Sequence, residues 1–376
     1  MASGNQMKGT TIKAYSLISP LGESIRENFN ALRDDRTGLS RIDDCALSDE
    51  PFIAAKINSL PSMDVLDTAS RFETLVIQSV NSALVNCSYR IELSKTVFIL
   101  ATTKGNIELL NDQRLSPDLD LHVAAKKIAS RFGIAMTYVV SNACTSGVMA
   151  LIAAKRLLKN NKFDYAIVTG ADVLSRFVVS GFQSLHALSD EPCRPFDAQR
   201  KGLNLGEAAA TVILSKEGNT DLFLLGDGSS NDANHISGPS RTGEELAHAI
   251  TSAIKDSAIA KEEIDFISAH GTATPYNDEM EAKAFAKAGL SSTPVNSLKG
   301  YFGHTLGAAG LVEVVMSIQS LRYDWLIPTK GFSTLGVSQP LNVIAKSETR
   351  RLKTFLKTAS GFGGCNAAVI IQHKKN

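Results

Sequence analysis

Short runs of β-branched and other apolar residues alternate along the chain with longer segments whose apolar positions recur at helical spacing. The short runs predict strands at residues 96–101, 136–140, 164–169, 208–214, 222–225, 264–269, 294–297, 355–360 and 367–372. The longer segments predict helices at residues 69–84, 146–159, 243–257, 277–288 and 307–321. Strands that alternate with helices in this way are typical of an α/β fold.

The segment 146–159 is apolar on nearly every side until Lys155, which predicts a helix buried between two layers. It belongs to a stretch without charges, residues 132–154, that is long enough to span a bilayer. Gly133, Gly147 and several hydroxyl and amide side chains interrupt this stretch. We therefore expect a strand, a turn and a buried helix here, and no membrane span.

Two segments half a chain apart are similar to each other. LGEAAATVIL at residues 205–214 and GGCNAAVIIQ at residues 363–372 both lead from a glycine into alanines and a β-branched strand. Any buried strand after a glycine turn can have this appearance, but the half-chain period favours a duplication. The turn-rich residues 217–221 then divide the chain into two βαβ-rich halves, 1–216 and 221–376.

The composition narrows the class of protein. The 376 residues carry 39 basic and 38 acidic side chains, a net charge of +1, and 44% of them are hydrophobic. These values are typical of globular proteins and exclude disorder, collagen and coiled coil. A nearly neutral chain also lacks the basic surface that nucleic-acid binding requires.

The five cysteines are widely spaced and form no C-x-x-C pair. This pattern is typical of a reducing compartment and predicts neither a disulfide framework nor a metal site. The first residues lack the apolar core of a signal peptide. We therefore expect a cytoplasmic protein.

Cys144 is the strongest candidate for a nucleophile. It lies in NACTSG, between a predicted strand and the buried helix. The unpaired N–H groups and dipole at a helix amino end stabilise an anion, so we expect the pKa of this thiol to be lowered. The alternative is that Cys144 is simply a small buried apolar residue.

Two histidines follow predicted strands. His270 begins HGTATPYND directly after one strand, and His304 ends KGYFGH, five residues after Lys299, shortly after another. The carboxyl ends of strands are where open α/β sheets place their ligands, although a histidine there can also be structural. Neither histidine has the helical pairing or the cysteine neighbour in sequence that is typical of zinc ligands.

The glycines of GFGG at residues 361–364 match neither dinucleotide-binding nor P-loop patterns. They predict a tight turn whose backbone N–H groups point into a site, where they could stabilise an oxyanion.

These four segments, NACTSG, HGTATPYND, KGYFGH and GFGGCN, resemble in order and spacing the signature segments of the β-ketoacyl-[acyl-carrier-protein] synthases. These are elongating condensing enzymes of the thiolase superfamily. The resemblance covers most of the chain, from residue 17 to the last predicted strand, and is strongest from residue 137 onward.

The resemblance implies a thiolase-like five-layered αβαβα fold built from two duplicated βαβαβαββ halves, usually as a homodimer. It implies a decarboxylative Claisen condensation between an acyl chain on the cysteine and malonyl-acyl carrier protein, in fatty acid or polyketide and polyene biosynthesis. The partner would be acyl carrier protein. No cofactor is expected, because the substrates carry the phosphopantetheine.

The resemblance also implies roles for individual residues. Cys144 would be the acylated nucleophile, and His270 and His304 would polarise the malonyl thioester and stabilise the enolate. Lys299 would pair with Glu313 and orient the histidine loop.

Other roles implied by the resemblance concern the substrate and its carrier. Thr272 and Thr274 would bind the phosphopantetheine arm, and Phe362, followed by Gly363, would be a gating aromatic whose N–H forms the oxyanion hole with that of Cys144. Basic residues that could dock the acidic carrier protein are Arg71, Arg200 and Lys201.

The chain departs from the family pattern at three places. Ser360 replaces a common aromatic residue and Cys365 a usual threonine, and the region 102–131, which helps to shape the acyl pocket, is shorter than usual. Two other functions remain as alternatives. A coenzyme A-dependent thiolase would use a second cysteine near the carboxyl terminus. A non-catalytic subunit similar to a chain-length factor would pair with an active synthase as a heterodimer. Such a subunit would generally lack a cysteine at the position of Cys144.

Overall fold

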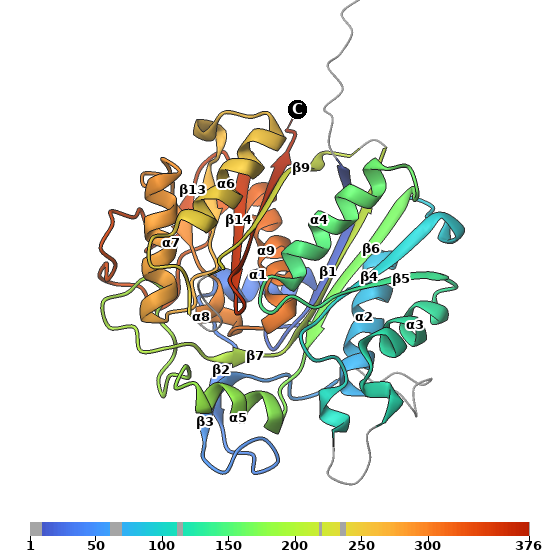
Figure 1. Cartoon of the computed structure of the whole chain (residues 1–376), viewed down its shortest axis with the longest axis horizontal. Helices are drawn as coiled ribbons and strands as arrows, with labels where there is room; N and C mark the ends of the chain where they lie inside the picture. The colour runs from blue at the N-terminus through green and yellow to red at the C-terminus, as the bar shows by residue number, and fades with distance from the viewer. Residues whose placement is uncertain (1–9, 61–69, 111–115, 218–219, 234–237, 376) are drawn as a thin grey trace, which may run out of the picture.

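The computed structural model describes residues 10–60, 70–110, 116–217, 220–233 and 238–375. Its main feature is one mixed sheet of ten strands in the order β11-β10-β14-β15-β9-β1-β8-β6-β4-β5 (Figure 1). The first half of the chain supplies β1 (Thr10–Ile18), β4 (Thr96–Ala101), β5 (Met136–Val140), β6 (Tyr165–Asp172) and β8 (Ala208–Ser215). The second half supplies β9 (Leu222–Asn231), β10 (Phe266–Ser268), β11 (Val295–Asn296), β14 (Thr354–Gly361) and β15 (Cys365–His373).

The strand order shows that the two halves have the same topology. From the centre outward, the first half runs β1, β8, β6, β4, β5, and the second runs β9, β15, β14, β10, β11. The half-sheets meet where Thr10 and Thr11 of β1 pair with Leu224 and Phe223 of β9. The two similar segments found in the sequence contain β8 and β15, which occupy equivalent places, so the expected duplication is confirmed in the topology.

Helices complete five layers around the two half-sheets. The helices α2 (Arg71–Val85) and α3 (Leu121–Arg131) cover the outer face of the first, and α6 (Glu244–Ser257) with α7 (Pro275–Lys287) covers the outer side of the second. Between them lie α4 (Ser146–Lys159) and α9 (Ala309–Tyr323). A large apolar cluster joins this central layer to both half-sheets, as the thiolase-like fold requires.

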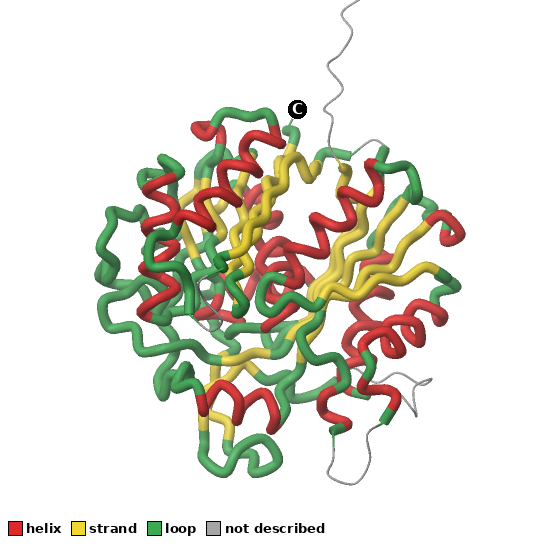
Figure 2. The backbone as a smooth tube through the Cα atoms, in the orientation of Figure 1, coloured by secondary structure: helices red, strands yellow, loops and turns green. Residues whose placement is uncertain are grey.

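Smaller elements surround these layers, and long loops connect them (Figure 2). They are α1 (Ile25–Arg33), α5 (Arg176–Ser184), α8 (Lys299–Phe302), a sheet of β2 (Leu39–Ile42), β3 (Phe52–Ala55) and β7 (Leu205–Gly206), a pair of β12 (Trp325–Leu326) and β13 (Glu348–Thr349), and five 3-10 turns, Leu93–Lys95, Ile107–Leu109, Pro117–Leu119, Lys261–Glu263 and Leu306–Ala308.

Glycines let the two central helices approach closely. A Cβ on Gly147 of α4 would lie 3.0 Å from the carbonyl oxygen of Gly307, and one on Gly310 of α9 would lie 2.9 Å from the amide nitrogen of Val148. Such contacts are closer than side chains normally tolerate, so these positions set the spacing between α4 and α9.

The uncharged stretch 132–154 forms β5, a turn and the buried part of α4, as expected from its glycines and polar residues. In the part of the chain that the structure describes, no helix has the length and apolar character needed to cross a membrane.

Candidate active site

Cys144 lies in a tight turn between β5 and α4. Ala143 has a φ of +45°, a left-handed conformation that is unusual for a residue with a Cβ. Two hydroxyl groups fix the turn: Ser146 Oγ accepts from the N–H of Asn142 at 2.8 Å and donates to the carbonyl of Ala143 at 2.6 Å, and Thr145 Oγ1 donates to the carbonyl of Asn142 at 2.7 Å. The Cys144 side chain is therefore held in a defined, buried position at the start of the central helix.

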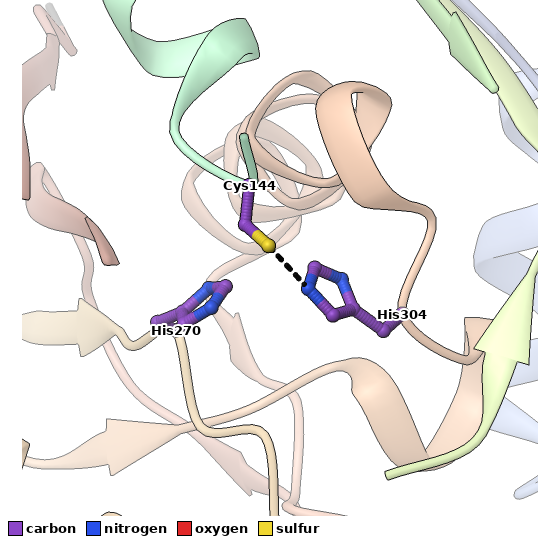
Figure 3. Close-up of side chains that lie close together, drawn as sticks. All are labelled: Cys144, His270 and His304. Carbon is purple, nitrogen blue, oxygen red and sulfur yellow. Dashed lines mark hydrogen bonds between the residues drawn. The ribbon is translucent and has the colours of Figure 1, made fainter. Parts of the chain in front are cut away.

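The two histidines reach this cysteine from the second half of the chain (Figure 3). His304 precedes α9 and places Nε2 3.0 Å from Cys144 Sγ. His270 follows β10, and its ring lies edge-on to that of His304, with centroids 5.2 Å apart and planes at 80°. The sulfur and a nitrogen of each ring lie within 4.8 Å of one another.

The first half of the chain holds the backbone of His304. Its N–H donates to the carbonyl of Asn204 at 2.7 Å, and its carbonyl accepts from Gly206 at 3.0 Å. Nδ1 of His304 has no hydrogen-bond partner among the described residues. His304 is therefore not oriented by a carboxylate as in a Ser-His-Asp triad.

Lys299 and Glu313 lie directly behind the histidines. Lys299 Nζ is 2.7 Å from Glu313 Oε1 and 3.3 Å from His270 Nδ1, and it also donates to the carbonyl of His270. Both side chains are almost fully buried. The structure thus makes the ion pair that the family resemblance implied and places it against His270.

Burial decides the charge state of the site. Burial, together with the Lys299 and Lys357 ammonium groups, holds the pKa of both His270 and His304 well below 6.5, so the imidazoles are neutral at physiological pH. Burial raises the pKa of the Cys144 thiol to about 12, and the Lys299 charge opposes this only in part. The expected lowering of the thiol pKa by the helix end is therefore wrong, because burial raises this pKa and outweighs the effect of the helix end.

Three of the buried charged residues that the sequence did not reveal hold segments next to the site. Lys357 of β14 lies 2.7 Å from Glu313 Oε2, and Glu281 of α7 accepts the N–H groups of His270 and Gly271 at 2.8 and 2.6 Å. Asp172, at the end of β6, accepts from Gly307 N at 2.6 Å in the turn that follows His304. For Lys357 and Asp172 the available signal was a single charge in an otherwise uncharged strand, whereas Glu281 lies among other charged residues of α7 and gave no such signal.

The residues expected to bind substrate surround this centre. Thr272 and Thr274 share a hydrogen bond of 2.8 Å between their hydroxyl groups in the loop after His270. Phe362 lies at the tip of the β14–β15 hairpin, is 41% exposed, and stacks on Phe182 with ring centroids 6.1 Å apart. The adjacent Gly363 has a φ of +86°, consistent with the expected tight turn.

The expected docking residues differ in what they offer to a partner. Arg71 is paired with buried Glu207 at 2.6 Å, and the side chain of Arg200, only 9% exposed, donates to the carbonyls of Asp197 and Gly336. The expectation that these two arginines present free surface charge is wrong, because both guanidinium groups serve internal contacts. Lys201 is 53% exposed and pairs with Glu191 at the surface.

One cysteine and two histidines also form a set that could hold zinc, since folding supplies the cysteine neighbour that the sequence pattern lacked. The ammonium groups of Lys299 and Lys357 lie behind the same histidines and disfavour a divalent cation. We keep the expectation that the site works without metal.

Comparison with known proteins agrees with this geometry. Residues 10–219 match the β-ketoacyl synthase N-terminal domain, and residues 223–333 match the β-ketoacyl synthase C-terminal domain. The chain belongs to the β-ketoacyl synthase family.

Some of the similar proteins align over nearly the whole chain. A 3-oxoacyl-[acyl-carrier-protein] synthase 2 of Coxiella burnetii is 28% identical over 97% of this chain and 99% of its own. The same kind of enzyme from Vibrio cholerae is 33% identical over 62% of this chain and 61% of its own. A structure of a ketosynthase in complex with its chain length factor, from Xenorhabdus doucetiae, has a chain that is 26% identical, covers 99% of this chain and all of its own, and gives a TM-score of 0.88.

Proposed function

We propose that this ketosynthase joins an acyl chain on Cys144 to the malonyl group of a malonyl-acyl carrier protein, with loss of CO₂. The observation that carries the proposal is the contact of one buried thiol with two neutral imidazoles, within 4.8 Å, at the junction of the two halves. A thiol can accept the acyl group, and two neutral imidazoles can donate to a developing enolate.

Acyl transfer comes first. Cys144 Sγ attacks the carbonyl carbon of the incoming thioester while its proton passes to His304 Nε2, 3.0 Å away. The carrier thiol leaves with a proton as the tetrahedral intermediate collapses. We propose that the N–H groups of Cys144 and Phe362 stabilise the oxyanion of this intermediate. The close approach of Gly361, next to Phe362, supports this, because a Cβ on Gly361 would lie 3.1 Å from the Cys144 nitrogen.

Condensation follows in the same pocket. His270, and His304 in the tautomer that carries its proton on Nε2, donate N–H hydrogen bonds to the malonyl thioester oxygen, the bond to the carboxylate breaks, and CO₂ departs. The resulting enolate carbon attacks the acyl carbonyl on Cys144, the carbon–sulfur bond breaks to release the product, and the Cys144 thiolate takes up a proton from solvent. Thr272 and Thr274 are proposed to bind the phosphopantetheine arm, which is the only prosthetic group that the reaction needs.

Two alternatives fit the site less well. A non-catalytic chain-length-factor-like subunit has no use for the thiol–imidazole contact of Cys144 and His304. A thiolase would need Cys365 as a second catalytic thiol, but Cys365 Sγ donates to the side chains of Asn142 and Asn231 at 2.9 and 3.2 Å, a structural role.

We also propose that the protein is a homodimer, or a heterodimer with a related subunit, that forms through β5. This strand is the outer edge of the sheet, its residues are half-exposed, and Met136 is 43% exposed. An unpaired edge strand offers a row of backbone hydrogen-bonding groups to a partner. Pairing of two β5 strands would continue the sheet across the dimer.

The activity is tested with acyl and malonyl groups on acyl carrier protein. Intact-mass spectrometry should show one acyl group on the wild type and none on Cys144→Ala, and only the wild type should form the 3-oxoacyl product. Cys365→Ser is the matched control and should still be acylated. A wild type that is never acylated by any carrier-bound or pantetheine thioester would overturn the proposal.

For the carrier protein, we propose that Lys201 belongs to the docking surface. Lys201→Glu should raise the KM for acyl carrier protein about three-fold or more at low salt, because rim charges act mainly on association. The same variant should turn over a small pantetheine thioester at the wild-type rate. Equal losses of activity with both substrates would indicate that Lys201 supports the active site and does not dock the carrier protein.

A further inference from the structure

Lys357 is a fully buried lysine in the middle of a central strand. It lies in β14 and is 0% exposed, whereas lysine side chains in strands normally extend to water. A buried ammonium group is tolerated only if it is paired and hydrogen-bonded. The contacts of Lys357 therefore identify the groups that it holds in place.

The contacts of Lys357 concentrate on the end of the strand that carries His270. β14 pairs in parallel with β10, with Lys357 opposite Ser268. Its Nζ donates to the carbonyls of Ser268 and Ala269, both at 3.0 Å, and to that of Thr358 at 2.6 Å. Ala269 is the residue directly before His270.

Other buried charges fix the neighbouring backbone atoms. Glu281 accepts the N–H of His270 at 2.8 Å, and Lys299 donates to the carbonyl of His270. Three consecutive polar backbone atoms, the Ala269 carbonyl, the His270 N–H and the His270 carbonyl, are thus each held by a different charged side chain. We call Lys357, Glu281 and Lys299 the His270 clamp.

Glu313 connects two members of this clamp. Its Oε1 is 2.7 Å from Lys299 Nζ, and its Oε2 is 2.7 Å from Lys357 Nζ. Without Lys357, one oxygen of a buried carboxylate would lose its cation, and the carboxylate could turn away from Lys299. Lys357 therefore also fixes the lysine that touches the His270 ring.

We propose that Lys357 is a positioning residue for His270 in the malonyl half of the reaction. The inference rests on the proposed function and goes beyond it, because Lys357 touches neither Cys144 nor His304 and acts through the backbone of His270 and through Glu313. It predicts that Lys357 matters for decarboxylation and not for transfer of the acyl group to Cys144.

Charge gives the lysine a second, measurable effect. The charged or titratable groups around His270 come from several elements: Lys299 of α8, Glu313 of α9, Glu281 of α7, Lys357 of β14, Cys144 and His304. The positive charge of Lys357 opposes protonation of His270. Loss of that charge raises the pKa of His270, so His270 becomes protonated at a higher pH. The pH below which decarboxylation is lost should therefore be higher than in the wild type.

The experiment compares two half-reactions in three variants. Acylation of Cys144 is followed by intact mass, and decarboxylation is followed by CO₂ release from malonyl-acyl carrier protein across pH 5 to 8. Lys357→Met should lower kcat for decarboxylation about ten- to a hundred-fold, in line with the cost of a small misplacement of a catalytic group, and move its acid limb to higher pH. Acylation of Cys144 should stay within about two-fold of the wild type, because the backbone of His304 is held by Asn204 and Gly206 and not by Lys357.

Two further variants separate charge from packing. Lys357→Gln keeps a donor for the carbonyls without the charge, so it should show the same shift of the acid limb with a smaller loss of kcat. Lys353→Met makes the same chemical change at an exposed position just before β14 and should match the wild type.

Each remaining outcome counts against the proposal. Equal losses of acylation and decarboxylation with an unchanged pH profile would make Lys357 a general stabiliser of the fold, as would failure of both Lys357 variants to fold. A wild type that is acylated but never releases CO₂ would overturn the proposed condensation itself, and this is seen before any variant is made.

Discussion

At the scale of single residues, the most informative contact is that of Cys144 Sγ with His304 Nε2. The thiol is protonated because burial raises its pKa to about 12, and His304 is neutral because burial keeps its pKa low. A neutral pair can react by transferring the proton as the sulfur attacks. His304 makes the hydrogen bond to the sulfur, whereas His270 lies edge-on to His304, so we expect the two histidines to contribute differently to acylation.

This difference predicts unequal effects on acylation. His304→Ala should slow acylation of Cys144 by about a hundred-fold, the loss typical of a general base, whereas His270→Ala should slow it only about two- to five-fold. Both variants should lose condensation. The measurement is the time course of acyl-enzyme formation by mass spectrometry, with circular dichroism as the control for folding. Equal acylation rates in the two variants would exclude His304 as the proton acceptor.

The buried histidines also predict how stability depends on pH. Below about pH 6.5 the unfolded chain binds a proton at each histidine and the folded chain does not, so the free energy of unfolding falls as pH is lowered. Each such histidine contributes about 1.4 kcal/mol per pH unit. The decrease between pH 6 and pH 5, measured by urea unfolding, should be smaller by about this amount in His304→Gln than in the wild type. The double variant with His270→Gln should lose both contributions, and a variant with the wild-type slope would contradict the argument.

Much of the site follows from the sequence because its chemistry lies in short motifs at the ends of elements. Cys144, His270, His304 and the Lys299–Glu313 pair were all named from the sequence, and the structure brings them together. The charge state of Cys144 was not predictable, because it depends on burial by distant segments. Lys357 and Glu281 escaped because a charged residue in a strand or helix usually indicates an exposed position, and only tertiary contacts show that these two are buried.

At the scale of elements, the periodicity located β4, β5 and α4 with their observed bounds. It missed β1, which is buried although it contains Thr11 and Ser16. Thr11 Oγ1 donates to Ser215 O at 2.9 Å and Ser16 Oγ to Ser79 O at 2.7 Å, so hydrogen bonds compensate for burial where the hydrophobic pattern is weak. The short helix α1 was also missed, although its start carries a capping box in which Ser24 pairs with Glu27.

The crossing of α4 and α9 gives a prediction for glycine. Gly310→Ala should push the helices apart, because the new Cβ would lie 2.9 Å from Val148 N. Since α4 carries the Cys144 turn and α9 follows His304, we expect destabilisation of about 1–3 kcal/mol, the usual cost of overpacking, together with slower acylation. Urea unfolding and acyl-enzyme formation measure the two effects.

The matched control is Gly181→Ala, in the interior of α5, where a Cβ would meet nothing within 4 Å. Alanine has the higher helix propensity, so this variant should be neutral or more stable by up to about 1 kcal/mol, with full activity. Equal stability and equal acylation rates in the two variants would show that α4 and α9 can separate without loss of stability or activity.

At the scale of the whole molecule, the proposed dimer makes a prediction about β5. Met136→Asp should dissociate the dimer, because it places a charge on an edge strand that the partner would cover. Light scattering after gel filtration should then give the chain mass of 40.2 kDa instead of twice that value. Val85→Asp changes an exposed apolar residue, 85% accessible at the end of α2, and should leave the mass unchanged. A wild type already at the chain mass would refute the dimer.

The matching topology of the two halves has a geometric consequence for the origin of the site. Cys144 lies between β5 and α4, and His304 lies between β11 and α9, which are equivalent places in the two halves. Their contact therefore lies between two turns that correspond to each other in the matching topology of the two halves. Two identical copies of one half, associated by true symmetry, would carry the same residues in both turns. In this chain one turn supplies a thiol and the other an imidazole, so the sequences of the two halves differ at the point where their corresponding turns meet.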